Sequence, residues 1–255
     1  MNLAEITPLI LTKDEEVNLG RTLGQLTWAN EVVVVDSMST DRTLEIARGF
    51  PNVRVVQRQI DTLAGQSQFG IAATETPWVL LLDADFFVPA AFVEELRTLE
   101  PPPDVRAYRA AFTYVINGKP LRASLYPPRV VLLHKQHANV WQDGHAHRVL
   151  VDGRTATLHA KLLHDDRKSF ERFVERQKRY MVQEAEKLRT ADPRALSLAS
   201  RVRKLIFVAP VAAFFHSLFI RGLVLDGRAG LRYAAERFTA EWLLSIELLR
   251  KLLHR

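Results

Sequence analysis

A run of four valines between Glu31 and Asp36 constrains the fold more than any other feature of the sequence. β-Branched side chains favour extended backbone, and an uninterrupted apolar run is typical of a strand buried on both faces of a parallel sheet. Similar apolar runs occupy 6–12, 53–56 and 78–82, and segments with helical spacing separate the four runs. This alternation predicts βαβ units that build a right-handed, mostly parallel α/β sheet.

The pattern changes in the second part of the 255-residue chain. Short apolar pieces with turns occupy 105–151, and Asn117-Gly118, between the pieces at 108–116 and 129–133, predicts a β-hairpin. From Ser169 onward the apolar spacing is helical. We therefore expect one α/β domain with a helical region appended to it.

Composition and charge limit the compartments and partners that we expect for the chain. The chain has no cysteine, which excludes a thiolate nucleophile and a cysteine zinc site and fits a reducing cytoplasm. Its first residues lack the basic flank, apolar run and cleavage site of a signal peptide. Residues 1–160 carry 15 Lys and Arg against 18 Asp and Glu, whereas 161–255 carry 20 against 11. The basic C-terminal part predicts an anionic partner, with a solvated helical face as the alternative.

The basic part contains an apolar stretch at 205–220. The stretch falls short of the roughly 20 residues that a membrane-spanning helix needs, and Pro210 and His216 interrupt it. We expect it to lie in the membrane interface or to pack on the domain. Together with the basic charge, it favours a cytoplasmic protein held peripherally on the inner face of the plasma membrane. We expect no nucleic-acid partner.

Polar side chains follow three of the predicted strands: Thr12, Asp36, and the pair Asp83 and Asp85. Open α/β sheets bind ligands beyond the carboxyl ends of their strands. Asp83 and Asp85 should share one side of an extended segment, where two carboxylates can hold a divalent cation that bridges phosphate oxygens. Capping of the next helix is the alternative. Asp36 can bind the uracil or ribose of a nucleotide, or cap the helix that begins near Asp41.

Three motifs carry a resemblance to a known family: Leu11-Thr12-Lys13-Asp14-Glu15, residues 31–43 (EVVVVDSMSTDRT) and residues 78–85 (WVLLLDAD). They resemble motifs of family 2 glycosyltransferases of the GT-A fold, most closely those of the branch that includes lipopolysaccharide-core β-glucosyltransferases. A looser similarity extends through Tyr126-Pro127-Pro128-Arg129 to Leu225-Asp226-Gly227.

The resemblance implies an architecture. A GT-A catalytic domain would span 1–165, with a nucleotide-sugar-binding half at 1–100 and an acceptor half at 101–165. Residues 166–255 would form the helical, basic extension that associates with the membrane. The implied activity is an inverting hexosyl transfer from a nucleotide sugar, a UDP-sugar being favoured, to a saccharide or lipid-linked acceptor in lipopolysaccharide or other cell-envelope glycan synthesis.

The resemblance also implies roles for single residues. Those expected to contact the nucleotide-sugar donor are Thr12, Glu15, Asp36, Gln68 and Asp83. Those expected to hold Mg²⁺ or Mn²⁺ are Asp83, Asp85 and His164. Gln68 stands where the branch often has Asn. For His164, which follows an apolar run, a purely structural role is the alternative.

The chain departs from the branch at two positions. Asp14 stands where the branch usually has Asn, and Arg148 replaces the Glu that usually follows His147. An inverting transfer needs a base that takes the proton of the acceptor hydroxyl. Because of the second departure, the family pattern does not identify the residue that acts as the catalytic base.

Three carboxylates are candidates for this base. Asp143 comes first, because it lies in a predicted turn near Trp141, whose ring can stack on a sugar; an ordinary turn residue is the alternative. Asp165 and Asp166 are the others, with capping of the following helix as their alternative. The adjacent Arg167 and Lys168 could neutralise a diphosphate.

Two other classes of protein compete with this interpretation. A nucleotidyltransferase would show a Gly-rich, basic signature near the first strand, and neither that nor G-x-G-x-x-G or G-x-x-x-x-G-K-[ST] is present. A Rossmann dehydrogenase and a P-loop enzyme are disfavoured for the same reason. A non-catalytic membrane-binding or nucleic-acid-binding protein would leave the acidic strand ends without a purpose.

Overall fold

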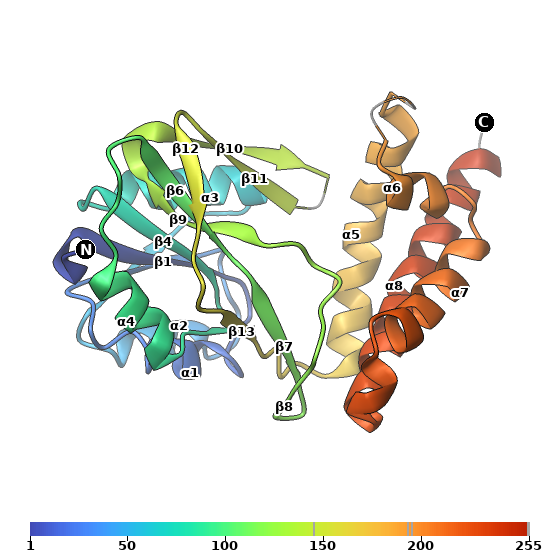
Figure 1. The fold of residues 1–255 in the computed structure, drawn as a ribbon, viewed down its shortest axis with the longest axis horizontal. Helices are drawn as coiled ribbons and strands as arrows, with labels where there is room; N and C mark the ends of the chain where they lie inside the picture. The colour runs from blue at the N-terminus through green and yellow to red at the C-terminus, as the bar shows by residue number, and fades with distance from the viewer. Residues whose placement is uncertain (145, 193, 195, 254–255) are drawn as a thin grey trace. The chain divides into compact units, whose positions relative to one another are not determined.

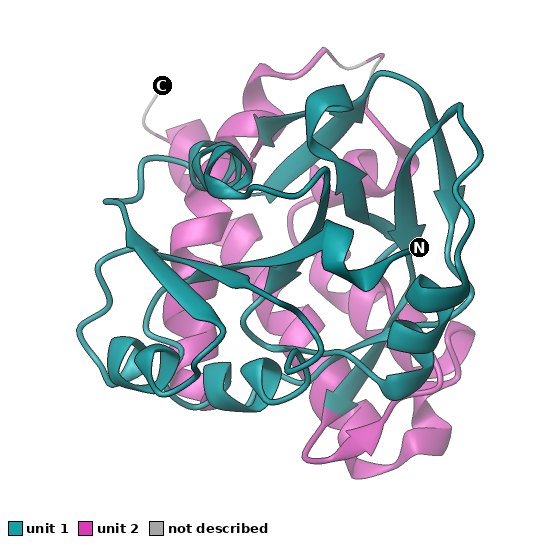
Figure 2. Cartoon of the chain, turned by 90° about the vertical axis from the view of Figure 1, so that its left-hand side faces the viewer, with its two compact units in different colours: residues 1–115, 126–142, 146–167 teal, residues 116–125, 143–145, 168–255 magenta. Residues whose placement is uncertain are grey.

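The computed structural model describes residues 1–144, 146–192, 194 and 196–253. The chain divides into two compact units, coloured separately in Figure 2. The first unit comprises residues 1–115, 126–142 and 146–167. The second comprises 116–125, 143–145 and 168–255, so it includes two short segments that the sequence did not separate from the first.

The first unit is built around a seven-stranded sheet in the order β12-β6-β9-β4-β1-β2-β3. Strands β12, β6, β9, β4 and β1 are labelled in Figure 1. Its strands are β1 (Ile6–Thr12), β2 (Val32–Asp36), β3 (Val53–Gln57), β4 (Trp78–Asp83), β6 (Val105–Ala110), β9 (Arg129–His134) and β12 (Arg154–Thr157). The four predicted strands, β1 to β4, run parallel, whereas β9 is antiparallel to both β4 and β6. The predicted mostly parallel α/β sheet is confirmed.

The valine run occupies both faces of this sheet. Val32 and Val34 belong to one hydrophobic cluster and Val33 and Val35 to another, and all four side chains are fully buried. The helical segments of the unit are η1 (Leu3–Glu5), α1 (Leu19–Leu23), α2 (Thr43–Arg48), α3 (Leu63–Ala73), α4 (Ala90–Thr98) and η2 (Lys135–His137). Helix α1 does not begin until Leu19, because the amides of residues 14–16 bond to side chains of the loop after β2 and the start of α2.

Two smaller sheets complete the strands. One has the order β5-β13-β7-β8, and β10 pairs with β11 in the other. Their strands are β5 (Phe86–Phe87), β7 (Phe112–Ile116), β8 (Lys119–Pro120), β10 (Ala138–Asp143), β11 (Ala146–Val151) and β13 (Leu162–His164). Asn117 and Gly118 have φ values of 52° and 76°, as a type I′ hairpin turn requires. The second strand of the hairpin is β8 and not the apolar run that becomes β9, which is a correction to the sequence prediction.

The second unit is helical, as predicted for the C-terminal region. Its segments are α5 (Phe170–Thr190), α6 (Leu198–Arg203), α7 (Val208–Phe215), the π-helical turn η3 (His216–Ile220), η4 (Leu223–Asp226) and α8 (Arg228–Leu253). Helices α5 and α7 both pack on α8, and Met181, Ala185, Leu188 and Leu244 are buried in one cluster. Among the residues that the structure describes, no helix has the length and hydropathy to cross a membrane.

Candidate active site

Asp36 organises the loops at the carboxyl ends of β1 and β2. Thr12 and Asp36 are partners in the register of the two strands, and Thr12 Oγ1 donates a hydrogen bond of 3.2 Å to Asp36 Oδ1. The fully buried carboxylate also accepts hydrogen bonds from the amide and hydroxyl of Ser39 and from Gln57 Nε2. The N–H of Thr43, in the first turn of α2, bonds instead to Asp41. Asp36 therefore braces the loop after β2 and does not cap α2.

The loop after β1 explains the departure at Asp14. Asp14 has a φ of 51°, a left-handed conformation that Asn and Asp tolerate better than other side chains. Its Oδ1 accepts a hydrogen bond of 2.8 Å from the Thr40 amide. An Asn offers an oxygen in the same place, so the departure conserves both the backbone conformation and the contact.

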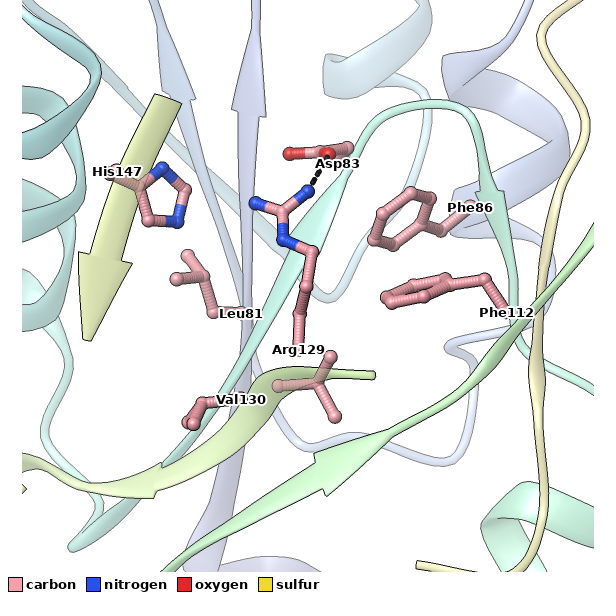
Figure 3. Close-up of a pocket in the computed structure, with 8 residues that line it drawn as sticks. Leu81, Asp83, Phe86, Phe112, Arg129, Val130 and His147 are labelled. Carbon is pink, nitrogen blue, oxygen red and sulfur yellow. Dashed lines mark ion pairs between the residues drawn. The ribbon is translucent and has the colours of Figure 1, made fainter. Parts of the chain in front are cut away.

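The Asp83-Ala84-Asp85 segment turns where an extended strand was expected. β4 ends at Asp83, and residues 84–85 form a turn before β5. The Asp83 side chain is 43% exposed, and its Oδ2 lies 3.8 Å from Arg129 Nη1 (Figure 3). The Asp85 side chain is only 9% exposed, and its Oδ2 lies 3.3 Å from His164 Nε2. The expected extended segment is therefore wrong at residues 84–85, because the turn breaks the period-two alternation of a strand.

His164 reaches Asp85 through strand pairing. β13 pairs antiparallel with β5, which sets His164 opposite Phe86 and one residue from the turn. Burial lowers the pKa of His164, but the charge and hydrogen bond of Asp85 and the charges of Asp83 and Asp166 outweigh it, so the pKa lies above its ordinary value. Within the described ranges, no three His, Asp or Glu side chains converge closely enough to hold a metal ion. Of the three predicted ligands, Asp85 and His164 are in contact with each other.

Asn18 ties the helix α1 region to the segment after β13. Its side chain is fully buried and donates to Glu15 Oε2 at 2.9 Å and to Asp166 Oδ1 at 3.1 Å. Its Oδ1 accepts hydrogen bonds from Arg21 Nη2 and from the Arg167 amide, both at 3.1 Å. This network holds the candidate nucleotide residue Glu15 in the same cluster as Asp166.

Asp165 is an anchor within this cluster. Its carboxylate forms ion pairs with Arg21 and Arg167, and its amide donates a 3.0 Å hydrogen bond to the Asp85 carbonyl. Both guanidinium groups donate hydrogen bonds to the same carboxylate oxygen, Oδ2. A role as catalytic base therefore suits Asp165 less well than Asp166.

A pocket beside Asp83 contains two residues that the sequence did not single out for catalysis, Arg129 and His147 (Figure 3). Its lining residues are Leu81, Asp83, Phe86, Phe112, Arg129, Val130, Val131 and His147. Burial, and then the charge of Arg129, lower the pKa of His147 to about 4, with Asp83 acting weakly in the opposite direction. His147 is therefore neutral near pH 7. Its Nδ1 atom is buried and has no hydrogen-bond partner in the described part of the chain.

The low pKa of His147 leads to a testable pH dependence of stability. Because the folded pKa of about 4 lies below the ordinary 6.5, the unfolded chain binds a proton that the folded chain does not as the pH falls through this window. Between pH 7 and pH 5 we expect the wild type to lose about 2 kcal/mol more unfolding free energy than His147→Gln. Urea unfolding of both proteins measures this; equal losses contradict it.

Two further candidates contact other parts of the chain. Gln68, on α3, donates to Asn139 Oδ1 and to the Val140 carbonyl of β10. Asp143 belongs to the second unit, where its Oδ1 lies 2.6 Å from Lys187 Nζ of α5. Gly144 follows with a φ of 65° and packs against the Glu184 and Lys187 side chains. Asp143 is thus a paired carboxylate in a tight turn.

Comparison with solved structures gives neighbours of low similarity. A crystal structure of S. aureus TarS 1-349 in complex with UDP is 17% identical, with 96% of this chain and 91% of that chain covered and a TM-score of 0.43. Glucosyl-3-phosphoglycerate synthase from Mycobacterium tuberculosis, in complex with Mn²⁺, UDP and glucosyl-3-phosphoglycerate, is 15% identical, with 74% and 81% covered and a TM-score of 0.46.

Comparison of sequences is more specific. The model of Glycosyl transferase family 2 matches residues 9–101. The lipopolysaccharide core biosynthesis glycosyltransferase LpsC of Rhizobium meliloti is 32% identical over 99 residues, which cover 37% of this chain and 36% of LpsC. An uncharacterised glycosyltransferase of Rickettsia bellii is 35% identical over 82 residues, 32% of this chain and 28% of the relative. The matched segments thus span between 28% and 36% of the length of these two relatives. Residues 9–101 are thus similar to glycosyl transferase family 2.

Proposed function

We propose that this chain is an inverting glycosyltransferase that moves a sugar from a UDP-sugar to a saccharide or lipid-linked acceptor of the cell envelope. The observation that carries the proposal is the contact between the nearly buried Asp85 and the partly buried His164 at the carboxyl end of β4, and Asp85 lies in the segment that matches the family 2 model. The name of the R. meliloti relative, a lipopolysaccharide core biosynthesis enzyme, supports the acceptor class.

The donor set at Asp85 and His164 fits a divalent cation. A carboxylate oxygen and an imidazole nitrogen, 3.3 Å apart, can both turn toward one ion, and Mn²⁺ accepts both kinds of ligand. The ion would neutralise the charge that develops on the departing diphosphate. Asp83 and Arg129, 3.8 Å apart, flank this position, and the exposed guanidinium can bind a phosphate oxygen.

The nucleotide would lie over the ends of β1 and β2. Thr12, Glu15 and Asp36 are held there by the hydrogen bonds of the two loops, so the site is preorganised before the donor arrives. We assign them to the nucleotide, with Gln68 as a further contact from α3. The neutral His147 can bind a sugar hydroxyl in the pocket beside Asp83.

A ligand screen tests the donor assignment. Nucleotide sugars are added to the protein with and without Mn²⁺, and the unfolding temperature is measured. A UDP-sugar at 100 times its Kd should stabilise the native state by about 2.7 kcal/mol, and the effect should require the metal. A screen in which no nucleotide sugar raises the unfolding temperature refutes the proposed function.

Asp143→Asn tests the first candidate for the base. We expect the variant to bind the donor normally but to transfer sugar at least about 100 times more slowly, since general base catalysis contributes factors of this size. Asp152→Asn, at an exposed loop position, is the matched control. The readout is labelled sugar incorporated from the UDP-sugar into a lipopolysaccharide precursor. Normal transfer by Asp143→Asn moves the role to Asp166 or Asp165.

A further inference from the structure

The second unit exposes a continuous apolar segment. Residues 205–220 contain no Asp, Glu, Lys or Arg, and they form the approach to α7, α7 itself and η3. Large side chains in and next to this segment are about half or more exposed: Leu205, Phe207, Val208, Val211, Phe215, Phe219, Ile220, Val224 and Leu225. We refer to these nine residues as the apolar surface. Its size and continuity distinguish it from scattered exposed hydrophobic residues.

Helical spacing separates the apolar surface from the side that packs on α8. Val208, Val211, Phe215 and Phe219 recur at intervals of three and four residues and face outward. Ala209, Pro210, Ser217 and Leu218 lie on the other side and are buried. The Phe215 and Phe219 rings stack on each other with centroids 5.9 Å apart. About half of the surface of each outward side chain is therefore not covered by the second unit.

Basic residues bracket the apolar surface. Residues 197–235 contain six Lys and Arg but one acidic residue, Asp226. Asp226 is 3% exposed and binds the Arg122 side chain and amide, so it offers no accessible negative charge. Arg201 and Lys204 precede the apolar segment, and Arg221 and Arg228 follow it. An apolar centre with cations at both ends complements a surface of anionic headgroups over acyl chains.

We propose that the apolar surface inserts into the headgroup region of an anionic lipid bilayer, with the flanking Arg and Lys side chains at the phosphates. This proposal rests on the proposed function, which gives a reason for membrane binding in its lipid-linked acceptor. It adds which surface of the chain contacts the membrane. A second copy of the chain is a poorer occupant, because a two-fold interface would bring the same cationic flanks against each other.

Vesicle sedimentation of the full chain tests the proposal. Vesicles contain either phosphatidylcholine alone or equal parts of phosphatidylcholine and phosphatidylglycerol, at low and at high salt. We expect binding to the anionic vesicles at least ten times tighter at low salt than at high salt, and little binding to neutral vesicles. The double variant Phe215→Glu, Phe219→Glu should lose binding at least tenfold. Leu150→Glu, at an exposed residue of the first unit, is the matched control and should bind like the wild type.

Three outcomes overturn the proposal: equal binding by the double variant and the wild type, equal binding to both kinds of vesicle, or a dimer in solution that the double variant abolishes. The donor screen is run on the same variants without vesicles. If the wild type binds vesicles but no nucleotide sugar, the result contradicts the proposed function alone. If the wild type binds a nucleotide sugar but no vesicles, the result contradicts only the proposal that the apolar surface binds a membrane.

Discussion

Asp85→Asn is expected to lower the metal-dependent hydrolysis of a UDP-sugar at least 100-fold. The substitution keeps the shape of the side chain but removes the charge that a divalent cation needs, and a 100-fold loss corresponds to about 2.7 kcal/mol of transition-state stabilisation. Because Asp85 is nearly buried against His164, the variant also removes the partner that raises the pKa of this imidazole. The measurement is the slow hydrolysis of UDP-glucose with and without Mn²⁺.

Two controls separate metal binding from general damage. Asp104→Asn neutralises an exposed carboxylate that pairs with Arg154, and it should leave hydrolysis unchanged. Asp83→Asn removes the partner of Arg129, and it should weaken donor binding more than metal binding. Hydrolysis at the wild-type rate by Asp85→Asn would exclude Asp85 from the metal site, whatever the effect of Asp83→Asn.

The sheet could be predicted because local chemistry and burial agree along the strands. The valine run, the apolar runs at 6–12 and 78–82, and the helices between them each have one structure that buries their side chains. The ends of the elements were harder to predict. Helix α1 is short because Asp14, Glu15 and Glu16 bond to the loop after β2, and no periodicity in the sequence encodes a contact between two loops.

The sequence itself indicates candidate site residues most directly where they follow a parallel strand. Thr12 and Asp36 meet because adjacent parallel strands end at one edge of the sheet. Arg129 and His147 come to Asp83 from β9 and β11, and the only local signal at His147 was its place before Arg148, where the chain departs from the family pattern. The different exposure and partners of Asp83 and Asp85 go with a two-residue turn, which the motif itself does not reveal.

Gly230→Ala is expected to destabilise the protein by about 3 kcal/mol or more, although alanine normally stabilises a helix relative to glycine by about 1 kcal/mol. Gly230 lies in the first turn of α8, where a Cβ atom would stand 1.8 Å from the Leu223 carbonyl oxygen and 3.1 Å from the Asp226 Cβ. Since the nearest atom is backbone, the start of α8 must move away from η4 to admit the methyl group. Such overpacking of a buried contact accounts for the large expected loss.

Two further glycines provide the comparison. Gly24→Ala, at the end of α1, would place its Cβ 3.4 Å from the nearest atom, an ordinary contact, and should leave stability nearly unchanged. Gly70→Ala would meet Leu9 and Val35 side-chain atoms within 2.8 Å in the core of the first unit, and should cost about 1–3 kcal/mol. Urea unfolding followed by circular dichroism gives the three values. If Gly230→Ala is as stable as the wild type, the start of α8 does not pack against the Leu223 carbonyl, and the described contact between η4 and α8 is wrong.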